Sequence, residues 1–300
     1  MIYPDGYIDH IICGDCLEVM KTLPDSIAQT CITSPPYWGL RDYGVDSQLG
    51  LEKTPEEYVT KMVAVFREVR RVLKDDGTMW LNLGDSYNGS GGAGGDYSSG
   101  GLRDGQPKYG RKFTGGLKPK DLIGIPWRVA FALQADGWWL RSDIIWSKPN
   151  PMPESVTDRP TKAHEYLFLM SKSAKYYYDA DAIREPNIWK DDPRNDGERH
   201  ETTGKYKSAV SFNSNGRNKR SVWTITTQPF PEAHFAVMPE KLVEPCVLAG
   251  SREGDTVLDP FMGAGTVAYV AKEFRRQYIG IELNAEYVKI TENRLRQGTL

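Results

Sequence analysis

The sequence predicts a doubly wound α/β fold on a mostly parallel sheet, and three observations support this. Short apolar runs that suit strands alternate with longer stretches of helical periodicity. A glycine-rich turn near the C-terminus joins one such strand to a helix. The length of 300 residues suits one large α/β domain with an insertion.

The N-terminal part predicts a strand–helix–strand unit. A short buried strand over 10–13 is followed by a helix over 17–23 and by an apolar strand over 30–32. The carboxyl ends of parallel strands meet at one edge of a sheet, where open α/β folds bind their ligands. Asp15 and Ser34, which follow the two strands, are therefore expected at that edge.

A long amphipathic helix is predicted next. Thr54 is its N-cap, Pro55 its first residue, and Glu57 completes a capping box. Its apolar stripe consists of Tyr58, Met62, Val65, Phe66, Val69 and Leu73. Asp76-Gly77 ends the helix, and residues 78–83 form the next strand.

The remaining elements continue the alternation. They are a helix over 125–135, strands over 140–146 and 164–170, a helix over 239–249, strands over 256–259 and 278–282, and a last helix through Leu295.

Two segments have little periodicity and carry positive charge. The second half of the Gly-rich loop 84–120 contains Arg103, Lys108, Arg111, Lys112, Lys118 and Lys120 against a single acid, Asp104. Residues 202–220 contain Lys205, Lys207, Arg217, Lys219 and Arg220 and no acid. Either segment is a solvated loop or a surface for phosphates and base edges. We interpret the second as part of an insertion over 183–233.

Composition and cysteine spacing limit the classes of protein. The net charge of -2 restricts any basic surface to local patches. The absence of a membrane-length apolar run and of a signal pattern leads us to expect a cytoplasmic protein without membrane contact. Cys13 and Cys16 form a CxxC, but Cys31 and Cys246 are isolated, so no zinc site is expected. Buried, reduced cysteines are favoured over a redox pair.

The C-terminal part predicts a nucleoside pocket. The strand 256–259, the turn Pro260–Thr266, a helix and a strand ending in Glu282 form the nucleoside-binding half of a Rossmann-like fold. Glycines let the backbone approach a ligand, and the acid accepts hydrogen bonds from ribose hydroxyls. The third glycine of the dinucleotide pattern is missing, which favours a cofactor without phosphates, such as S-adenosylmethionine.

The stretch Thr33–Trp38, of sequence TSPPYW, is the candidate catalytic segment. Two prolines hold it rigid, and their carbonyls remain free to accept hydrogen bonds. Alone, it suits either a turn packed over aromatics or a site that holds a flat ring and an amino group. When the C-terminal unit is placed ahead of residue 8, a circularly permuted doubly wound sheet results. Residues 261–265, Glu282, Asp15 and Ser34 then converge on one edge.

Together these motifs resemble the amino-methylating DNA methyltransferases, the N4-cytosine and N6-adenine enzymes. Their cofactor loop is similar to Asp259–Thr266, and their catalytic tetrapeptide to Ser34–Tyr37. The motif order resembles that of the beta class. The resemblance implies S-adenosylmethionine as cofactor, double-stranded DNA as partner and no metal. Together with the loss of periodicity over the basic insertion, it leads us to divide the chain into a catalytic part, 1–182, a target-recognition insertion, 183–233, and a cofactor-binding part, 234–300.

The resemblance also implies roles for individual residues. The catalytic ones are Ser34, Pro35, Pro36 and Tyr37. The cofactor-binding ones are Asp15, Thr33, His234, Phe235, Ala236, Asp259, Pro260, Phe261, Gly263, Gly265, Thr266 and Glu282. The two basic segments lie outside the resemblance; from their charge, DNA contacts are expected from Lys108, Arg111, Lys112, Lys205, Lys207, Arg217, Lys219 and Arg220.

The expected chemistry is direct methyl transfer to an exocyclic amino group. The Ser34 hydroxyl and the Pro35 carbonyl would accept its hydrogen bonds, while Tyr37 stacks on a flipped base. Methylation at cytosine C5 needs a cysteine after a proline, and Pro245-Cys246 lies in a predicted helix far from the catalytic strand end. Serine at the first tetrapeptide position favours N4-cytosine over N6-adenine.

Other functions stay open at this point. They are methylation of RNA, methylation of a protein amide, and an inactive DNA-binding module. The sequence also leaves open whether the chain forms a homodimer or has a cognate restriction endonuclease as partner.

Overall fold

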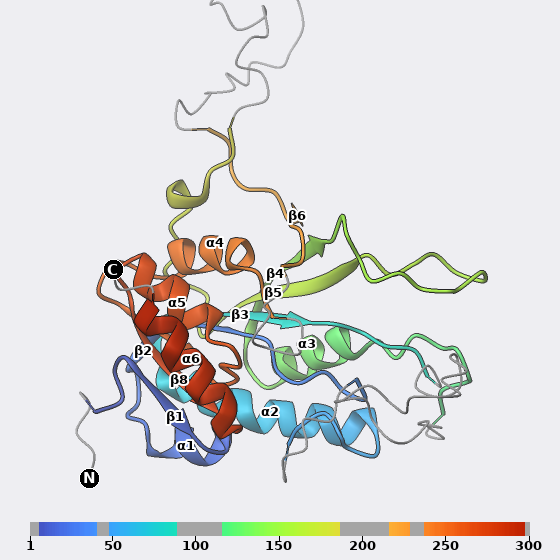
Figure 1. Ribbon diagram of the computed structural model, residues 1–300, viewed down its shortest axis with the longest axis horizontal. Helices are drawn as coiled ribbons and strands as arrows, with labels where there is room; N and C mark the ends of the chain where they lie inside the picture. The colour runs from blue at the N-terminus through green and yellow to red at the C-terminus, as the bar shows by residue number, and fades with distance from the viewer. Residues whose placement is uncertain (1–5, 41–47, 89–115, 187–215, 229–236, 298–300) are drawn as a thin grey trace, which may run out of the picture.

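The computed structural model describes residues 6–40, 48–88, 116–186, 216–228 and 237–297. These residues form an eight-stranded sheet with helices on both faces (Figure 1). The strands are β1 (His10–Cys13), β2 (Ala28–Thr33), β3 (Leu73–Leu83), β4 (Trp139–Ser147), β5 (His164–Ser171), β6 (Val222–Thr224), β7 (Thr256–Asp259) and β8 (Gln277–Glu282). The helices are α1 (Cys16–Thr22), α2 (Pro55–Val72), α3 (Ile125–Ala135), α4 (Glu240–Gly250), α5 (Thr266–Glu273) and α6 (Ala285–Gln297), with a 3-10 turn over Asp181–Ile183.

The strand order confirms the permuted, doubly wound sheet. It is β1-β8-β7-β2-β3-β5-β4-β6, and only β5 runs antiparallel to the other described strands. On one side of β7 lie β8 and then β1, the first strand of the chain, and on the other side lie β2 and β3. The reversal between β7 and β2 is a topological switch point, where adjacent strand ends open a crevice for a ligand.

The two faces of the sheet bury separate hydrophobic cores. The first core joins α1, α2 and α3 to alternate strand residues such as Cys31, Met79 and Ile281. The second joins α4, α5 and the end of α6 to the intervening residues, such as Ile32 and Trp80. This alternation follows from the period of two residues along a strand.

Helix α2 begins as predicted and ends earlier. The Thr54 hydroxyl accepts a hydrogen bond from Glu57 N at 3.1 Å, and Pro55 is the first helical residue. The helix stops at Val72, however, and Leu73 pairs with Ala28 as the first residue of β3. The prediction of a helix up to Asp76-Gly77 was therefore wrong, because pairing with β2 outweighs helical periodicity at this point.

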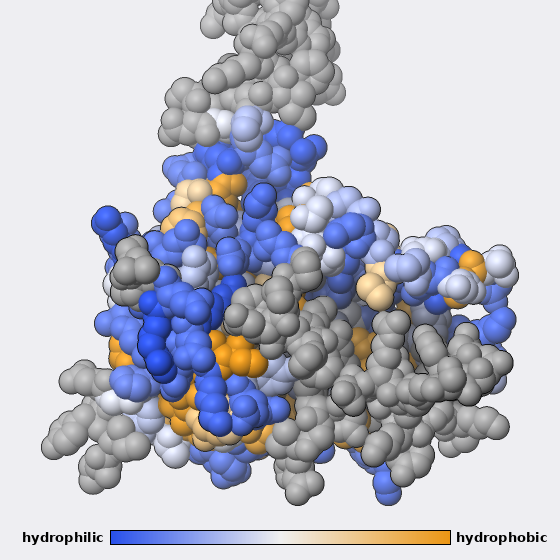
Figure 2. Space-filling model, in the orientation of Figure 1, coloured by the Kyte–Doolittle hydropathy of each residue, from blue (hydrophilic) through white to orange (hydrophobic). Residues whose placement is uncertain are grey.

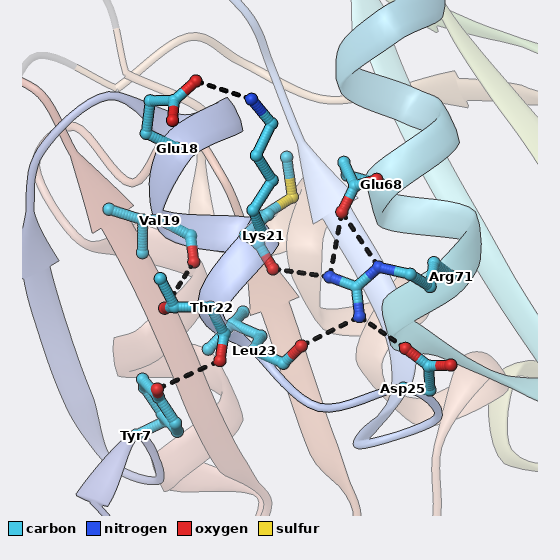
Figure 3. A network of polar contacts seen from close by, with 10 residues as sticks. Tyr7, Glu18, Val19, Lys21, Thr22, Leu23, Asp25, Glu68 and Arg71 are labelled. Atoms are coloured by element: carbon cyan, nitrogen blue, oxygen red, sulfur yellow. Dashed lines mark hydrogen bonds and ion pairs between the residues drawn. The ribbon is translucent and has the colours of Figure 1, made fainter. Parts of the chain in front are cut away.

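Arg71 of α2 fixes the turn that leads into β2. Its guanidinium donates to Met20 O at 2.6 Å and Leu23 O at 2.8 Å, and it pairs with Asp25 and Glu68 (Figure 3). Met20 O also accepts the N–H of the C-cap residue Leu23 at 2.9 Å, and Leu23 O lies past the last helical residue. The arginine thus adds a donor to both carbonyls and holds the turn before the strand that ends next to Ser34.

The face shown in Figure 2 is mostly hydrophilic over α6, whose Thr291 and Leu295 are buried. No helix in the described ranges is long and apolar enough to cross a membrane.

All four cysteines are free thiols. Cys13 is exposed at the edge strand β1. Both the strand and its thiol were expected to be buried, so the structure corrects both predictions.

Candidate active site

A cavity of about 280 Å³ opens at the carboxyl ends of the parallel strands. Residues that follow β1, β2, β7 and β8 meet around it, which is the convergence that the sequence predicts. The predicted site residues that line it are Asp15, Ser34, Pro35, Pro36, Tyr37, Asp259, Pro260, Phe261, Gly263, Thr266 and Glu282. Their roles remain predictions, but the fold brings them to one place.

The glycine turn has the geometry that its sequence requires. Gly263 and Gly265 have φ angles of 52° and 76°, in the left-handed region that favours glycine. A Cβ on Gly265 would also lie 2.1 Å from Thr291 Cγ2 of α6. Gly265 does not line the cavity; it caps α5 and lets α6 approach.

Glu282 is held at the end of β8 by backbone donors. Its Oε2 accepts from Gly263 N and its Oε1 from Asn284 N, both at 2.8 Å. Burial raises the pKa of this carboxyl, and the two backbone hydrogen bonds oppose that rise. A ligand hydroxyl that donates to Glu282 would favour the ionised form further.

Asp259 is the most deeply buried carboxyl of the cavity, with 1% of its surface exposed. Thr33 Oγ1 donates to it at 2.6 Å and Phe261 N at 3.0 Å. Burial raises the pKa of Asp259 to about 7 despite these hydrogen bonds. Thr33 is itself fully buried and lies behind Asp259, so its expected direct contact with the cofactor is replaced by a hydrogen bond across β2 and β7.

The raised pKa of Asp259 predicts a specific pH dependence of stability. The folded protein binds the proton more tightly than the unfolded chain, so this contribution is complete below about pH 4. It is lost as the pH rises through the folded pKa of about 7. Asp259→Asn should remove this decline, which is about 3 kcal/mol at most between pH 5 and pH 8, as measured by urea unfolding at these two pH values. Asp75→Asn, at a side chain 96% exposed, should leave it unchanged.

The tetrapeptide is fixed by contacts on three sides. Tyr58 of α2 donates to Pro36 O at 2.9 Å. The Tyr37 ring lies against Gly84, just past β3. The contact is so close that a Cβ on Gly84 would be 2.5 Å from Tyr37 Cε2. Ser34 Oγ donates to the Tyr37 hydroxyl at 3.3 Å. Trp38 is buried, as expected of a packing residue, and donates to Glu52 O.

Among the cavity residues that were not predicted as site residues, three polar ones form a group next to Tyr37. Asn82 and Glu165 both accept from the Tyr37 hydroxyl, and Lys148 forms an ion pair with Glu165. Glu165 lies in the strand predicted over 164–170, which gave it no site role. Their contacts with Tyr37 span 45 and 128 positions, so no local pattern could reveal them.

The predicted DNA-binding residues are placed only in part. Lys108, Arg111, Lys112, Lys205 and Lys207 lie outside the described residues, as do His234, Phe235 and Ala236 of the cofactor set. Arg217 and Arg220 both pair with Glu185, at 3.1 and 3.0 Å. Lys219 Nζ lies 4.9 Å from the centre of the Trp223 ring. Glu185 thus compensates part of a charge that the segment 202–220 by itself leaves unopposed.

The structure also agrees with the rejection of cytosine C5 chemistry. Cys246 lies inside α4, is fully buried and donates to Leu242 O. Burial raises the pKa of its thiol well above the ordinary value, so it is no candidate nucleophile.

The fold and the cavity define a Rossmann-like α/β protein with a ligand cavity at the switch point of its sheet, beside the SPPY segment. The family model described as DNA methylase, of the N6/N4 methyltransferases, matches residues 28–293. The chain belongs to this family of DNA amino-methyltransferases.

Curated relatives agree with that assignment, and solved structures share the fold. The type II methyltransferase M.Cfr9I of Citrobacter freundii is 49% identical over 94% of this chain and 86% of its own length. M.SmaI of Serratia marcescens is 49% identical over 95% and 90%. The PvuII cytosine-N4-specific DNA methyltransferase shares the fold, with a TM-score of 0.66, 19% identity and coverage of 95% and 85%. The M1.HpyAVI–SAM complex also shares it, with a TM-score of 0.54, 18% identity and coverage of 95% and 98%.

Proposed function

We propose that this DNA methyltransferase transfers a methyl group to the exocyclic N4 amino group of a flipped cytosine in duplex DNA. The observation that carries the proposal is the position of Ser34–Tyr37 on the same cavity as Glu282 and the glycine turn. The serine at position 34 favours cytosine as the base. N6-adenine is the alternative, because adenine presents the same amino group beside a ring nitrogen.

S-adenosylmethionine is the cofactor, and it supplies an electrophilic methyl group when bound. The residues present fit it. Gly263 and Ala264 bring bare backbone to the cavity, and Glu282 offers a carboxylate to ribose hydroxyls. Asp15, at the N-cap of α1, faces the same cavity from β1, where the adenine would lie. Met238, beside the start of α4, lines it as well.

The protein's own task is to orient a weak nucleophile. The lone pair of an exocyclic amino group is delocalised into the base. Hydrogen bonds from that group to Ser34 Oγ and Pro35 O would favour a pyramidal nitrogen with its lone pair directed at the methyl group. Fixed geometry of this kind supplies most of the rate in a direct transfer. The rigid prolines and the buried contacts of Tyr37 and Tyr58 maintain it.

Nucleoside mass spectrometry tests the choice of base. Duplex DNA treated with protein and cofactor is digested and analysed for methylated nucleosides. We expect N4-methylcytosine. N6-methyladenine instead would overturn the choice of cytosine, and methylated RNA or protein without methylated DNA would overturn the substrate class. Methyl transfer to none of the three would favour an inactive DNA-binding module.

The basic residues near β6 are proposed to contact DNA phosphates. Replacement of Lys219 and Arg220 by glutamine should weaken DNA binding and lower the slope of log K against log salt by about 2 at most. The decrease in slope should be smaller if Arg220 of the unaltered protein stays paired with Glu185 and makes no phosphate contact. Titrations at several salt concentrations measure the slope. Lys21→Gln, which removes an exposed charge of α1 paired with Glu18, serves as control; an unchanged slope in the double variant would remove these residues from the DNA surface.

The wider assignments rest on the same family. We propose the division into 1–182, 183–233 and 234–300, although Val222–Thr224 extends the main sheet as β6. A cytoplasmic location and a cognate restriction endonuclease suit relatives named type II methyltransferases. A homodimer is a further proposal, which light scattering of the purified protein tests.

A further inference from the structure

The cavity contains a chain of polar groups that continues beyond the tetrapeptide. Ser34 Oγ donates to the Tyr37 hydroxyl at 3.3 Å, and that hydroxyl donates to Glu165 Oε2 at 2.8 Å. Lys148 Nζ contacts the other oxygen of Glu165. All four residues line the cavity, and they come from the ends of β2, β4 and β5.

The hydrogen bonds give this chain a direction. Tyr37 has a single hydroxyl proton and two nearby acceptors, Glu165 and Asn82 Oδ1 at 3.0 Å. Asn82 Nδ2 donates to Tyr166 O, which turns its oxygen toward the phenol. The carboxylate is closer and, being charged, is the stronger acceptor. The proton of Ser34 therefore points to Tyr37 and that of Tyr37 to Glu165, which leaves lone pairs of Ser34 Oγ free to accept from an amino group.

The surroundings keep both ends of this chain in place. The side chains of Lys148 and Glu165 are 17% and 16% exposed, and Lys148 Nζ lies 4.2 Å from the centre of the Trp146 ring. Burial, and then the charge of Glu165, raise the pKa of Tyr37 well above its ordinary value. Tyr37 is thus a phenol that can donate one proton as it accepts another. Successive hydrogen bonds ending on a charge strengthen one another.

Resting on the proposed function, we propose that Glu165 is the terminal acceptor of the proton that leaves the substrate amine. The N–CH3 bond forms as the S–CH3 bond of the methyl donor breaks, and the methylated nitrogen becomes strongly acidic. Its proton passes to Ser34 Oγ, the Ser34 proton to Tyr37, and the Tyr37 proton to Glu165. The N–H electron pair returns to the nitrogen, and Glu165 ends neutral beside Lys148. Glu165 acts through Tyr37 and Ser34 and is a positioning residue.

Before methyl transfer, the same series of hydrogen bonds makes Ser34 Oγ a better hydrogen-bond acceptor for the substrate amine. Its own proton is already donated toward a carboxylate, so more negative charge remains on its oxygen. Glu165 therefore affects the rate of methyl transfer and not only the loss of the proton.

The first test measures single-turnover methyl transfer to duplex DNA by the full chain. Glu165→Gln and Tyr37→Phe should each lower the rate by about 100-fold, while the dissociation constants of cofactor and DNA change less than about threefold. The double variant should be no slower than Tyr37→Phe, because removal of the phenol already disconnects Glu165. Glu68→Gln, at a partly buried carboxyl paired with Arg71 of α2, is the matched control (Figure 3).

The second test does not use activity. The ionisable groups near the Tyr37 hydroxyl are Glu165 of β5, Tyr58 of α2 and, through Glu165, Lys148, which follows β4. NMR of protein with labelled tyrosine rings, with the Tyr37 signal assigned by Tyr37→Phe, follows its ionisation. Glu165→Gln should lower the pKa of Tyr37, and Glu68→Gln should not.

The outcomes separate this proposal from the proposed function. Additive rate losses in the double variant, losses in affinity without loss of rate, or a Tyr37 pKa insensitive to residue 165 would overturn the role of Glu165. If Glu165→Gln fails to fold because Lys148 is left unpaired, Tyr37→Phe alone is the test. An unchanged rate in Tyr37→Phe would then overturn the proposed path of the proton from Ser34 to Glu165. If the unaltered protein methylates no DNA, the proposed function itself fails.

Discussion

Replacement of Ser34 by alanine is expected to lower the rate of methyl transfer by about 100- to 1,000-fold. Ser34 is the end residue of the hydroxyl chain and the only side chain of the tetrapeptide with an oxygen free to accept from the substrate amine. Alanine leaves the backbone of the prolines, and hence the Pro35 carbonyl, in place. Single-turnover kinetics with labelled cofactor measure the rate.

Cofactor affinity should remain nearly unchanged in this variant. Ser34 lines the cavity from β2, whereas the glycine turn and Glu282 approach it from β7 and β8. Ser142→Ala, on β4 and outside the cavity lining, is the matched control. Loss of cofactor binding in Ser34→Ala, with the fold intact, would contradict the role assigned to Ser34.

Replacement of Glu282 by glutamine is expected to weaken cofactor binding by about 30- to 100-fold, since hydrogen bonds to a charged acceptor contribute about 1.5–3 kcal/mol each. Both carboxylate oxygens already accept a backbone N–H, from Gly263 and Asn284. A glutamine must present its amide NH2 to one of these donors. Calorimetry measures the affinity directly.

The matched control for Glu282 is Glu286→Gln on α6, a carboxyl 75% exposed that pairs with Lys289. Glu286→Gln removes one negative charge, as Glu282→Gln does, at the second residue of α6. Full affinity in Glu282→Gln would show that the carboxylate does not hold the cofactor. Equal losses in both variants would indicate a general effect of net charge.

The comparison of sequence with structure shows which features are local. The cap at Thr54 and the glycine turn were predictable, because caps and left-handed glycines depend on a few adjacent residues. The permuted sheet was predictable as well, since strand ends that must share one edge restrict the topology. The end of α2 was not, because Leu73 takes its conformation from Ala28, which lies in another strand.

By itself the sequence determined the α/β fold, the converging site and the family of DNA amino-methyltransferases. Each of these depends on motifs a few residues long and on their order along the chain. The tertiary structure alone decided that Thr33 holds Asp259, that Glu185 pairs with two arginines, and that the SPPY segment leads through Tyr37 to Glu165. These contacts form between distant segments when the sheet assembles, and burial then sets their strength.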